Sequence, residues 1–244
     1  MLRLREPQLK PGEFRTSGTT GVPKTLHFSD ADLSARMDAM EASKPPGFKD
    51  IKSWFNEVRP DSTAFHKHAE YHKAKGNVIH TPPGASIAAT VASWKEKHPE
   101  GIVSSAAGLT NYALAKPGYQ FKMLIAVGEP LNKHRSKIIR EALGDNLWVS
   151  YASTETDTIS FASAKDVEAC KERGSYVGKP VPGVEVKVVD ANGELIYGPV
   201  GEVCVRTPRL AKGALVDSGG YYHTGDLGSM INNDGAIVLT GRKQ

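Results

Sequence analysis

Residues 16–25 concentrate groups that can bind a polyphosphate, in the segment Thr-Ser-Gly-Thr-Thr-Gly-Val-Pro-Lys-Thr. Glycine lets the backbone turn back on itself and present successive N–H groups, and the hydroxyls add further donors. The expected phosphate contacts are Thr16, Ser17, Gly18, Thr19, Thr20, Gly21 and the ammonium group of Lys24. ATP is the natural candidate ligand. A polar surface loop has the same composition, so this segment alone does not decide between the two.

The spacing from Gly18 to Thr25 also fits the P-loop pattern G-x-x-x-x-G-K-[ST], except that Pro23 stands where the second glycine should be. Proline has no N–H and a fixed φ, so it cannot approach the phosphates as the start of a P-loop helix requires. The sequence therefore disfavours an unrelated P-loop NTPase.

Four further short motifs follow along the chain. Residues 128–131 read Gly-Glu-Pro-Leu, residues 151–155 read Tyr-Ala-Ser-Thr-Glu, residues 222–226 read Tyr-His-Thr-Gly-Asp, and residues 241–242 read Gly-Arg. Together with residues 16–25 they resemble, in the same order, the signature motifs of adenylate-forming enzymes. That family includes acyl- and aryl-CoA synthetases, the adenylation domains of peptide synthetases, and luciferases. Because five motifs occur in the right order, the resemblance covers essentially the whole chain.

The resemblance implies an AMP-forming acid ligase, in which a carboxylate oxygen attacks the α-phosphorus of ATP·Mg²⁺ and gives an acyl-adenylate. ATP and Mg²⁺ are the expected cofactors, a small carboxylic acid is the substrate, and coenzyme A or a carrier-protein thiol is the acyl acceptor. It implies catalytic roles for Lys24, Thr154, Glu155 and His66, with Glu155 as the Mg²⁺ ligand. Besides residues 16–21, it implies nucleotide contacts by Gly128, Glu129, Pro130, Tyr151, Asp226 and Arg242.

The residue types suit these roles. Tyr151 has a flat apolar face that can stack on adenine, and an ionised Asp226 offers two acceptor oxygens to the ribose hydroxyls. The alternative interpretation is that Thr154 and Glu155 cap a strand end and that Asp226 is a plain turn residue. The neighbouring Gly-Glu-Pro-Leu motif favours the functional interpretation.

Members of the family carry a large stretch before the phosphate loop and a mobile domain after the hinge, whereas about fifteen residues precede Thr16 and two follow Arg242. The catalytic lysine of that last domain has no counterpart, so we expect slow adenylation by this chain alone, or none. The main alternative is a catalytically weak or inactive ATP- or AMP-binding remnant with a regulatory or partner-dependent role. A missing companion subdomain would expose an apolar face, which favours a homodimer or a separately encoded partner.

The composition limits the other classes of protein. A chain of 244 residues with 39% hydrophobic content can bury a real core. The net charge of +4 is too small and too dispersed to indicate nucleic-acid binding, and no apolar run is long enough for a membrane span. The N-terminus lacks the apolar core of a secretory signal, so a cytoplasmic location is expected. Cys170 and Cys204 have no partners at metal-binding spacing and are expected to be inert packing residues.

Strands and helices are predicted to alternate through the first part of the chain. Residues 29–32 have the form of a capping box and predict a helix of about four turns after them. Strands are predicted at 76–80, 102–107, 121–127 and 147–151, with helices at 84–98 and 131–143. Such alternation indicates a parallel α/β sheet, which binds ligands at the carboxyl ends of its strands. The motifs at 128–129 and 151–155 fall at such ends.

Four histidines lie close together in the sequence, at His66, His68, His72 and His80. His68 and His72 have the i,i+4 spacing of a helical metal site, but Glu70 is the only acidic residue near them. We therefore favour a solvated helix face over a metal site.

After Gly174 the pattern changes to short alternating runs at 184–189 and 202–206, and Asp234-Gly235 before residues 236–239 predicts a hairpin. The predicted fold is an α/β protein: a parallel α/β sheet subdomain followed by a small antiparallel β-barrel-like subdomain. The corresponding boundaries are 1–174 for the nucleotide-binding subdomain, 175–240 for the small β subdomain and 241–244 for a hinge stub.

Overall fold

The computed structural model describes residues 13–15, 25–60, 62–84, 86–231 and 235–243. Its helices are α1 (Asp30–Ser43), the short 3-10 helix η1 (Phe48–Asp50), α2 (Thr63–Ala74), α3 (Ile87–Lys97), α4 (Ala106–Leu114), α5 (Lys133–Leu143) and α6 (Ala164–Ala169). Its strands are β1 (Glu13–Arg15), β2 (Thr25–His27), β3 (Ser53–Asn56), β4 (Val78–His80), β5 (Gly101–Ser104), β6 (Met123–Val127), β7 (Leu147–Ser153), β8 (Asp157–Ser163), β9 (Ser175–Pro180), β10 (Glu185–Val189), β11 (Gly201–Arg206), β12 (Tyr222–Ile231) and β13 (Ala236–Arg242). In the described part, β1 pairs with β2, and the other strands form one sheet in the order β10-β11-β12-β13-β9-β8-β7-β6-β5-β3-β4.

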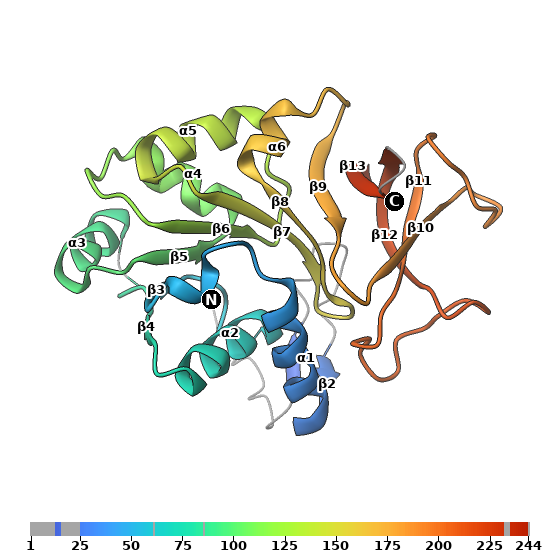
Figure 1. The fold of residues 1–244 in the computed structure, drawn as a ribbon, viewed down its shortest axis with the longest axis horizontal. Helices are drawn as coiled ribbons and strands as arrows, with labels where there is room; N and C mark the ends of the chain where they lie inside the picture. Colours follow the sequence, from blue (N-terminus) through green and yellow to red (C-terminus); the bar gives the residue numbers. More distant parts are fainter. Residues whose placement is uncertain (1–12, 16–24, 61, 85, 232–234, 244) are drawn as a thin grey trace, which may run out of the picture.

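The strands β4, β3, β5, β6 and β7 run parallel, with helices on both faces (Figure 1). Neighbouring residues of a strand point to opposite faces. Phe55 and Ile102 therefore join the buried cluster with α3, α4 and α5, whereas Trp54 and Val103 pack on the other face with Tyr71 of α2. This half confirms the predicted parallel α/β sheet.

Side-chain caps fix where the α-helices begin. The predicted capping box is confirmed at α1, where the backbone N–H of Ser29 donates to Asp32 Oδ2 over 2.9 Å and the Asp32 N–H donates to Ser29 Oγ over 3.3 Å. The other α-helices start at an oxygen-bearing cap as well: Ser62, Ser86, Ser105, Asn132 and Ser163. The cap at Ser105 ends the predicted strand 102–107 early, because Ala106 already belongs to α4.

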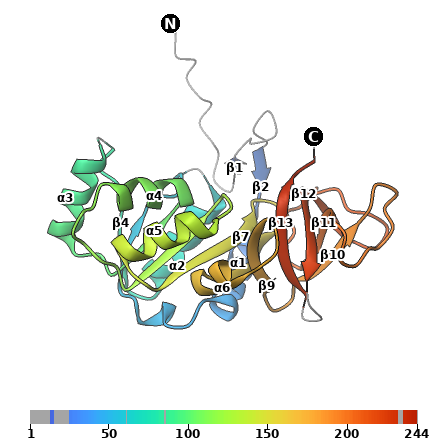
Figure 2. The same ribbon diagram turned by 90° about the horizontal axis from the view of Figure 1, so that it is seen from above.

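The second half of the sheet is antiparallel, as predicted for the residues after Gly174, and lies beside the first half in Figure 2. The predicted barrel-like form is not confirmed, because no closed barrel is found among the described residues. The reason is strand β9, which pairs with β8 on one side and β13 on the other and so continues the sheet across both halves. The division into units at residues 174 and 175 stays a prediction.

The predicted solvated helix face is wrong for His68 and His72. His68 and His72 of α2 are 6% and 0% exposed, and they pack against the rings of Phe48 and Trp54. These residues lie on the face of α2 that covers the sheet, so their imidazoles serve as core side chains.

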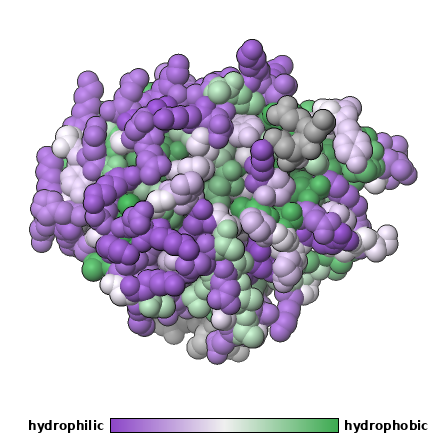
Figure 3. All heavy atoms as spheres, viewed as in Figure 1, coloured by the Kyte–Doolittle hydropathy of each residue, from purple (hydrophilic) through white to green (hydrophobic). Residues whose placement is uncertain are grey.

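Large apolar side chains remain exposed at scattered positions of the described chain: Val78, Ile87, Leu114, Leu195, Tyr197, Val200, Leu215 and Val216. Hydrophilic side chains cover most of the face seen in Figure 3. The expected homodimer or partner contact stays a prediction. Among the described residues, no helix combines the length and apolar character needed to cross a bilayer.

Candidate active site

The predicted phosphate segment, with Thr16, Ser17, Gly18, Thr19, Thr20, Gly21 and Lys24, lies outside the described residues. The strands on either side of it are described: β1 and β2 pair antiparallel, with Arg15 opposite Thr25. Helix α1 follows β2 after a short connection.

The Gly-Glu-Pro motif directly follows β6, at the carboxyl end of the parallel strands. Gly128 has a φ of +79°, a conformation that glycine adopts without steric cost, and Gly128 and Pro130 are both exposed. The carboxylate of Glu129 accepts a hydrogen bond from the backbone N–H of Ala107, at the start of α4. The side chain of Glu129 therefore stabilises the start of α4, while the exposed backbone around Gly128 remains accessible at the strand end.

Three of the predicted site residues meet at the carboxylate of Asp226. Tyr151 of β7 donates a hydrogen bond of 2.7 Å from its hydroxyl to Asp226 Oδ2 of β12. Arg242 of β13 lies on the other oxygen, with 3.4 Å between its Nη1 and Asp226 Oδ1. Burial and the nearby Asp226 charge raise the pKa of Tyr151 well above its ordinary value, so the hydroxyl remains a donor.

Tyr151 is only 9% exposed, because its ring packs into the cluster between the two halves of the sheet. A base that stacks on it would therefore contact only part of the ring. The Asp226 side chain is 18% exposed and that of Arg242 is 46% exposed, so both can meet a ligand from solvent.

Glu202 of β11 was missed by the sequence analysis, although it binds the backbone of β12 directly before Asp226. Its Oε1 accepts the backbone N–H of Gly225 over 3.2 Å, and its Oε2 lies 3.0 Å from Lys243 Nζ. Gly225 itself has a φ of +75°. Glu202 lies in an alternating strand pattern, and nothing in that pattern distinguishes it from an outward-facing polar residue.

Thr154 and Glu155 lie at the tip of the hairpin between β7 and β8, where Ser153 pairs with Asp157. Their side chains are half-buried. Burial, and then the charge of Glu155, raise the pKa of Tyr222 to about 12, which puts the Glu155 carboxylate beside the first residue of the 222–226 motif. Three motifs thus meet at this edge: 151–155, 222–226 and 241–242.

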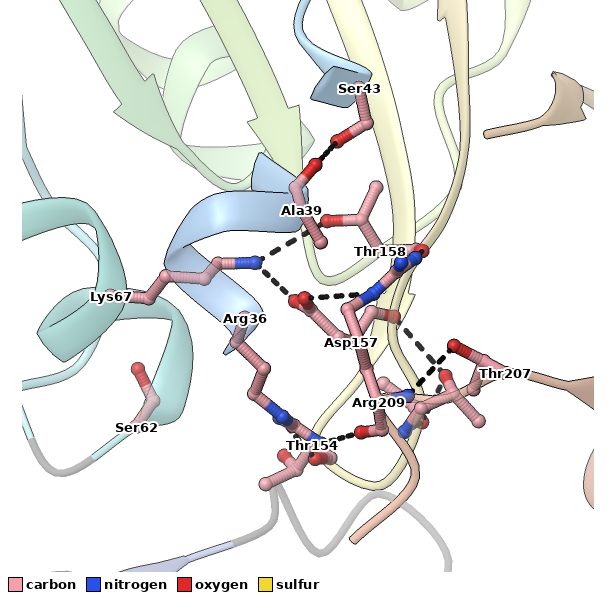
Figure 4. A network of polar contacts seen from close by, with 12 residues as sticks. Arg36, Ala39, Ser43, Ser62, Lys67, Thr154, Asp157, Thr158, Thr207 and Arg209 are labelled. Carbon is pink, nitrogen blue, oxygen red and sulfur yellow. Dashed lines mark hydrogen bonds and ion pairs between the residues drawn. The ribbon is translucent and has the colours of Figure 1, made fainter. Parts of the chain in front are cut away.

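A buried polar network lies under this hairpin (Figure 4). Lys67 of α2 forms an ion pair with one oxygen of Asp157, and Arg209 Nε lies 3.4 Å from the other oxygen. Burial alone would raise the pKa of Asp157, but the positive charges of Lys67, Arg36 and Arg209 outweigh it, and the pKa is lowered. The carboxylate therefore remains ionised in the interior.

Arg36 of α1 belongs to the same network and was missed as well. A sequence signal for it exists, because Arg36 falls beside the apolar positions Leu33 and Met37 of the predicted helix stripe. An arginine at a core-facing position needs buried partners, so this position indicates a buried polar contact but not which groups Arg36 binds.

His66, also a predicted catalytic residue, is half-buried on α2, with its ring centroid 5.4 Å from that of Phe14 in β1. No polar contact joins His66 to Tyr151, Asp226 or Glu155 in the described part of the chain. In the same part, no three histidine, cysteine or acidic side chains gather into a metal-binding group. Cys170 and Cys204 are free thiols, and burial raises the pKa of Cys204 to about 12, in keeping with the predicted packing role.

The chain is similar to known proteins over most of its length. A family model described as AMP-binding enzyme matches residues 15–215. The chain is 31% identical over 147 residues to long-chain-fatty-acid–CoA ligase 6 of Mus musculus, covering 55% of this chain and 20% of that protein. It is 26% identical to probable CoA ligase CCL8 of Humulus lupulus, covering 93% of this chain and 42% of that one.

Among solved structures, the amide bond synthetase McbA from Marinactinospora thermotolerans is similar over the full length of this chain. The TM-score is 0.79 and the sequence identity 27%, with 51% of the solved chain covered. The chain thus spans about half of the length of that solved structure, and less than half of the length of each of the two relatives.

Proposed function

The chain belongs to the family of AMP-binding enzymes, and we propose that it binds ATP·Mg²⁺ and activates a carboxylic acid as an acyl-adenylate. The observation that carries the proposal is the hydrogen bond of 2.7 Å between Tyr151 and Asp226. It joins two motifs 75 residues apart at the edge where parallel strands end. Ligands bind at this edge in open α/β sheets.

In this proposal, Asp226 accepts the ribose hydroxyls. Each carboxylate oxygen has two lone pairs, so Asp226 can accept from Tyr151 and from a ribose at the same time. The Tyr151 hydroxyl orients the carboxylate, and the half-exposed Arg242 limits the approach of the ribose from solvent. The exposed backbone at Gly128 would line the base, with Tyr151 contacting it edgewise.

Thr154 and Glu155 would face the phosphates from the hairpin tip. Mg²⁺ is commonly held by one or two carboxylates together with substrate phosphates and water. A single half-buried Glu155 fits that pattern. When bound, Mg²⁺ would neutralise phosphate charge, and the protein would orient the carboxylate of the acid toward the α-phosphorus. Transfer to coenzyme A or to a carrier-protein thiol is the expected next reaction, by analogy with the CoA ligases.

The test measures nucleotide binding by the purified chain. A ligand present at a hundred times its Kd and specific for the folded state raises the free energy of unfolding by about 2.7 kcal/mol. The temperature of thermal unfolding should therefore rise in the presence of AMP and in the presence of ATP·Mg²⁺. Asp226→Asn should weaken both ligands by about tenfold or more, because a charged acceptor is lost. Asp190→Asn is the matched control, since Asp190 accepts backbone N–H groups in a turn between β10 and β11.

No thermal shift at millimolar nucleotide, or equal effects of the two substitutions, would contradict the proposed site. Acid-dependent exchange of labelled pyrophosphate into ATP then separates the two functions. Exchange with at least one acid of a panel supports an adenylating enzyme. Binding without exchange, for this chain and for any longer form, would favour the nucleotide-binding remnant.

A further inference from the structure

Arg36 places its guanidinium directly on the backbone of the Thr154–Glu155 hairpin tip. Its Nη1 donates to the carbonyl oxygen of Thr154 over 3.0 Å, and its Nη2 donates to that of Glu155 over 3.0 Å. Nη2 also donates to the carbonyl oxygen of Arg209 over 2.7 Å. The whole side chain is 2% exposed and its guanidinium lies 4.1 Å from the centroid of the Phe28 ring.

One of these backbone carbonyl groups accepts a second hydrogen bond from the segment that carries Arg209. The carbonyl oxygen of Glu155 also accepts a hydrogen bond from the N–H of Ala211 over 2.7 Å, so Arg36 and the 209–211 segment bind the same carbonyl group. The next residues turn sharply, since Asp157 has a φ of +65°. A non-glycine residue in this region is held by its surroundings, which here are the ion pairs to Lys67 and Arg209.

The basic residues of the network bind different groups. Asp157 already has Lys67 and Arg209 as ion-pair partners, whereas the terminal nitrogens of Arg36 donate to carbonyl oxygens (Figure 4). Three carbonyls in different directions require the planar fork of a guanidinium. A lysine ammonium at the same position carries the charge without that geometry.

We propose that Arg36 is a positioning residue that holds the hairpin tip so that Thr154 and Glu155 face the phosphates and Mg²⁺. It couples helix α1, which follows the 16–25 segment in sequence, to the tip between β7 and β8. This inference rests on the proposed function, and it assigns no contact between Arg36 and the nucleotide.

The test compares Arg36→Lys and Arg36→Met with the wild-type chain. Binding of ATP is measured by calorimetry over a range of Mg²⁺ concentrations, and binding of adenosine serves as the reference because adenosine carries no phosphate. In both variants, ATP·Mg²⁺ should bind at least about tenfold more weakly, a loss of about 1.4 kcal/mol. The Mg²⁺ concentration for half-maximal ATP binding should also rise, while adenosine binding should stay within about twofold.

Arg140→Met is the matched control. Arg140 likewise makes several side-chain contacts, a half-buried one to Glu168 and exposed ones to Asp145, but it lies on α5 away from the hairpin. This control should leave the Mg²⁺ dependence unchanged.

The outcomes separate this inference from the function on which it rests. If the wild-type chain binds neither ATP nor AMP, the proposed function is wrong. If the wild type binds and both Arg36 variants keep the wild-type Mg²⁺ dependence, only the positioning role is overturned. A parallel loss of adenosine and ATP binding, or a failure of both variants to fold, would assign Arg36 to the fold alone and equally overturn it.

Discussion

The histidine pair of α2 should make this protein sensitive to mild acid. His72 is fully buried and stacks on Phe48, with 5.3 Å between ring centroids, and the His68 ring lies 4.4 Å from it. Burial, and then the charges of Lys44 and Lys52, lower the pKa of His72 to about 3. Burial, His72 and the neighbouring Lys44 and Lys67 lower the pKa of His68 well below its ordinary value.

The direction of the pH effect on stability follows from proton uptake by the folded and unfolded states. Below about pH 6.5 the unfolded chain protonates these histidines, whereas the folded chain keeps them neutral. The free energy of unfolding therefore falls with decreasing pH, by about 1.4 kcal/mol per pH unit for each group. At pH 5 each histidine would cost about 2 kcal/mol, or about 4 kcal/mol for the pair. That is a large share of the roughly 5–15 kcal/mol that stabilises a typical domain.

Urea unfolding at pH 7.5 and pH 5.0 measures this loss. We expect about 4 kcal/mol for the wild type and clearly less for His68→Phe and His72→Phe, which keep an aromatic ring in the cluster. His134→Gln is the control, since His134 is exposed on α5 and should leave the loss unchanged. An equal loss in the wild type and in both phenylalanine variants would refute the argument that these imidazoles are buried neutral.

Two further changes test the packing. Burial lowers the pKa of Lys44 to about 6, so the folded chain at pH 8 holds this amine deprotonated, and Lys44→Met should raise the free energy of unfolding by about 1–3 kcal/mol. Urea unfolding measures this change, with substitution of an exposed lysine, Lys49→Met, as the control. A lower free energy of unfolding in Lys44→Met would contradict the prediction. A Cβ at Gly178 would lie 1.9 Å from the carbonyl oxygen of Phe161, so Gly178→Ala should destabilise by more than about 3 kcal/mol. Gly193→Ala has a similar φ of +85° but open space, so it should cost only about 1–2 kcal/mol, and equal thermal shifts for the two would contradict the steric argument.

Local signals predicted the parallel half well because they act within a few residues. The capping box at Ser29 and the alternation of apolar runs with helical spacing located α1, α3, α5, β4, β6 and β7 to within a few residues. Strand β3 was missed, since residues 53–56 are a short buried run without a turn signal on both sides. The histidines were misassigned because residue type suggested solvent, whereas tertiary packing buried the face of α2 that carries them.

The site likewise contains residues that the sequence predicts and residues that it does not. The motif residues Tyr151, Asp226 and Arg242 could be predicted from resemblance, and the structure brings them to one carboxylate. The helical spacing hinted at burial of Arg36, but the roles of Arg36 and Glu202 could not be predicted, because these roles lie in which distant backbone groups the two side chains bind. Such contacts depend on the packing of α1 against the β7–β8 hairpin and on the register of β11 with β12, which no local pattern encodes.

The meeting of Tyr151 and Asp226 depends on how strand β9 joins the two halves of the sheet. Tyr151 pairs with Ser160 of β8, and Ser160 pairs with Pro180 of β9, whose other side pairs with β13. Strands β8 and β9 pair at two positions, Ser160 with Pro180 and Phe161 with Lys179, and apolar side chains around Tyr151 fill the space between the halves. Asp226 is therefore held near Tyr151 by a narrow strand junction and a packed cluster, and the closeness of Gly178 to Phe161 sets how near β9 can lie. The candidate nucleotide site and the junction of the sheet are, in this protein, parts of one packing arrangement.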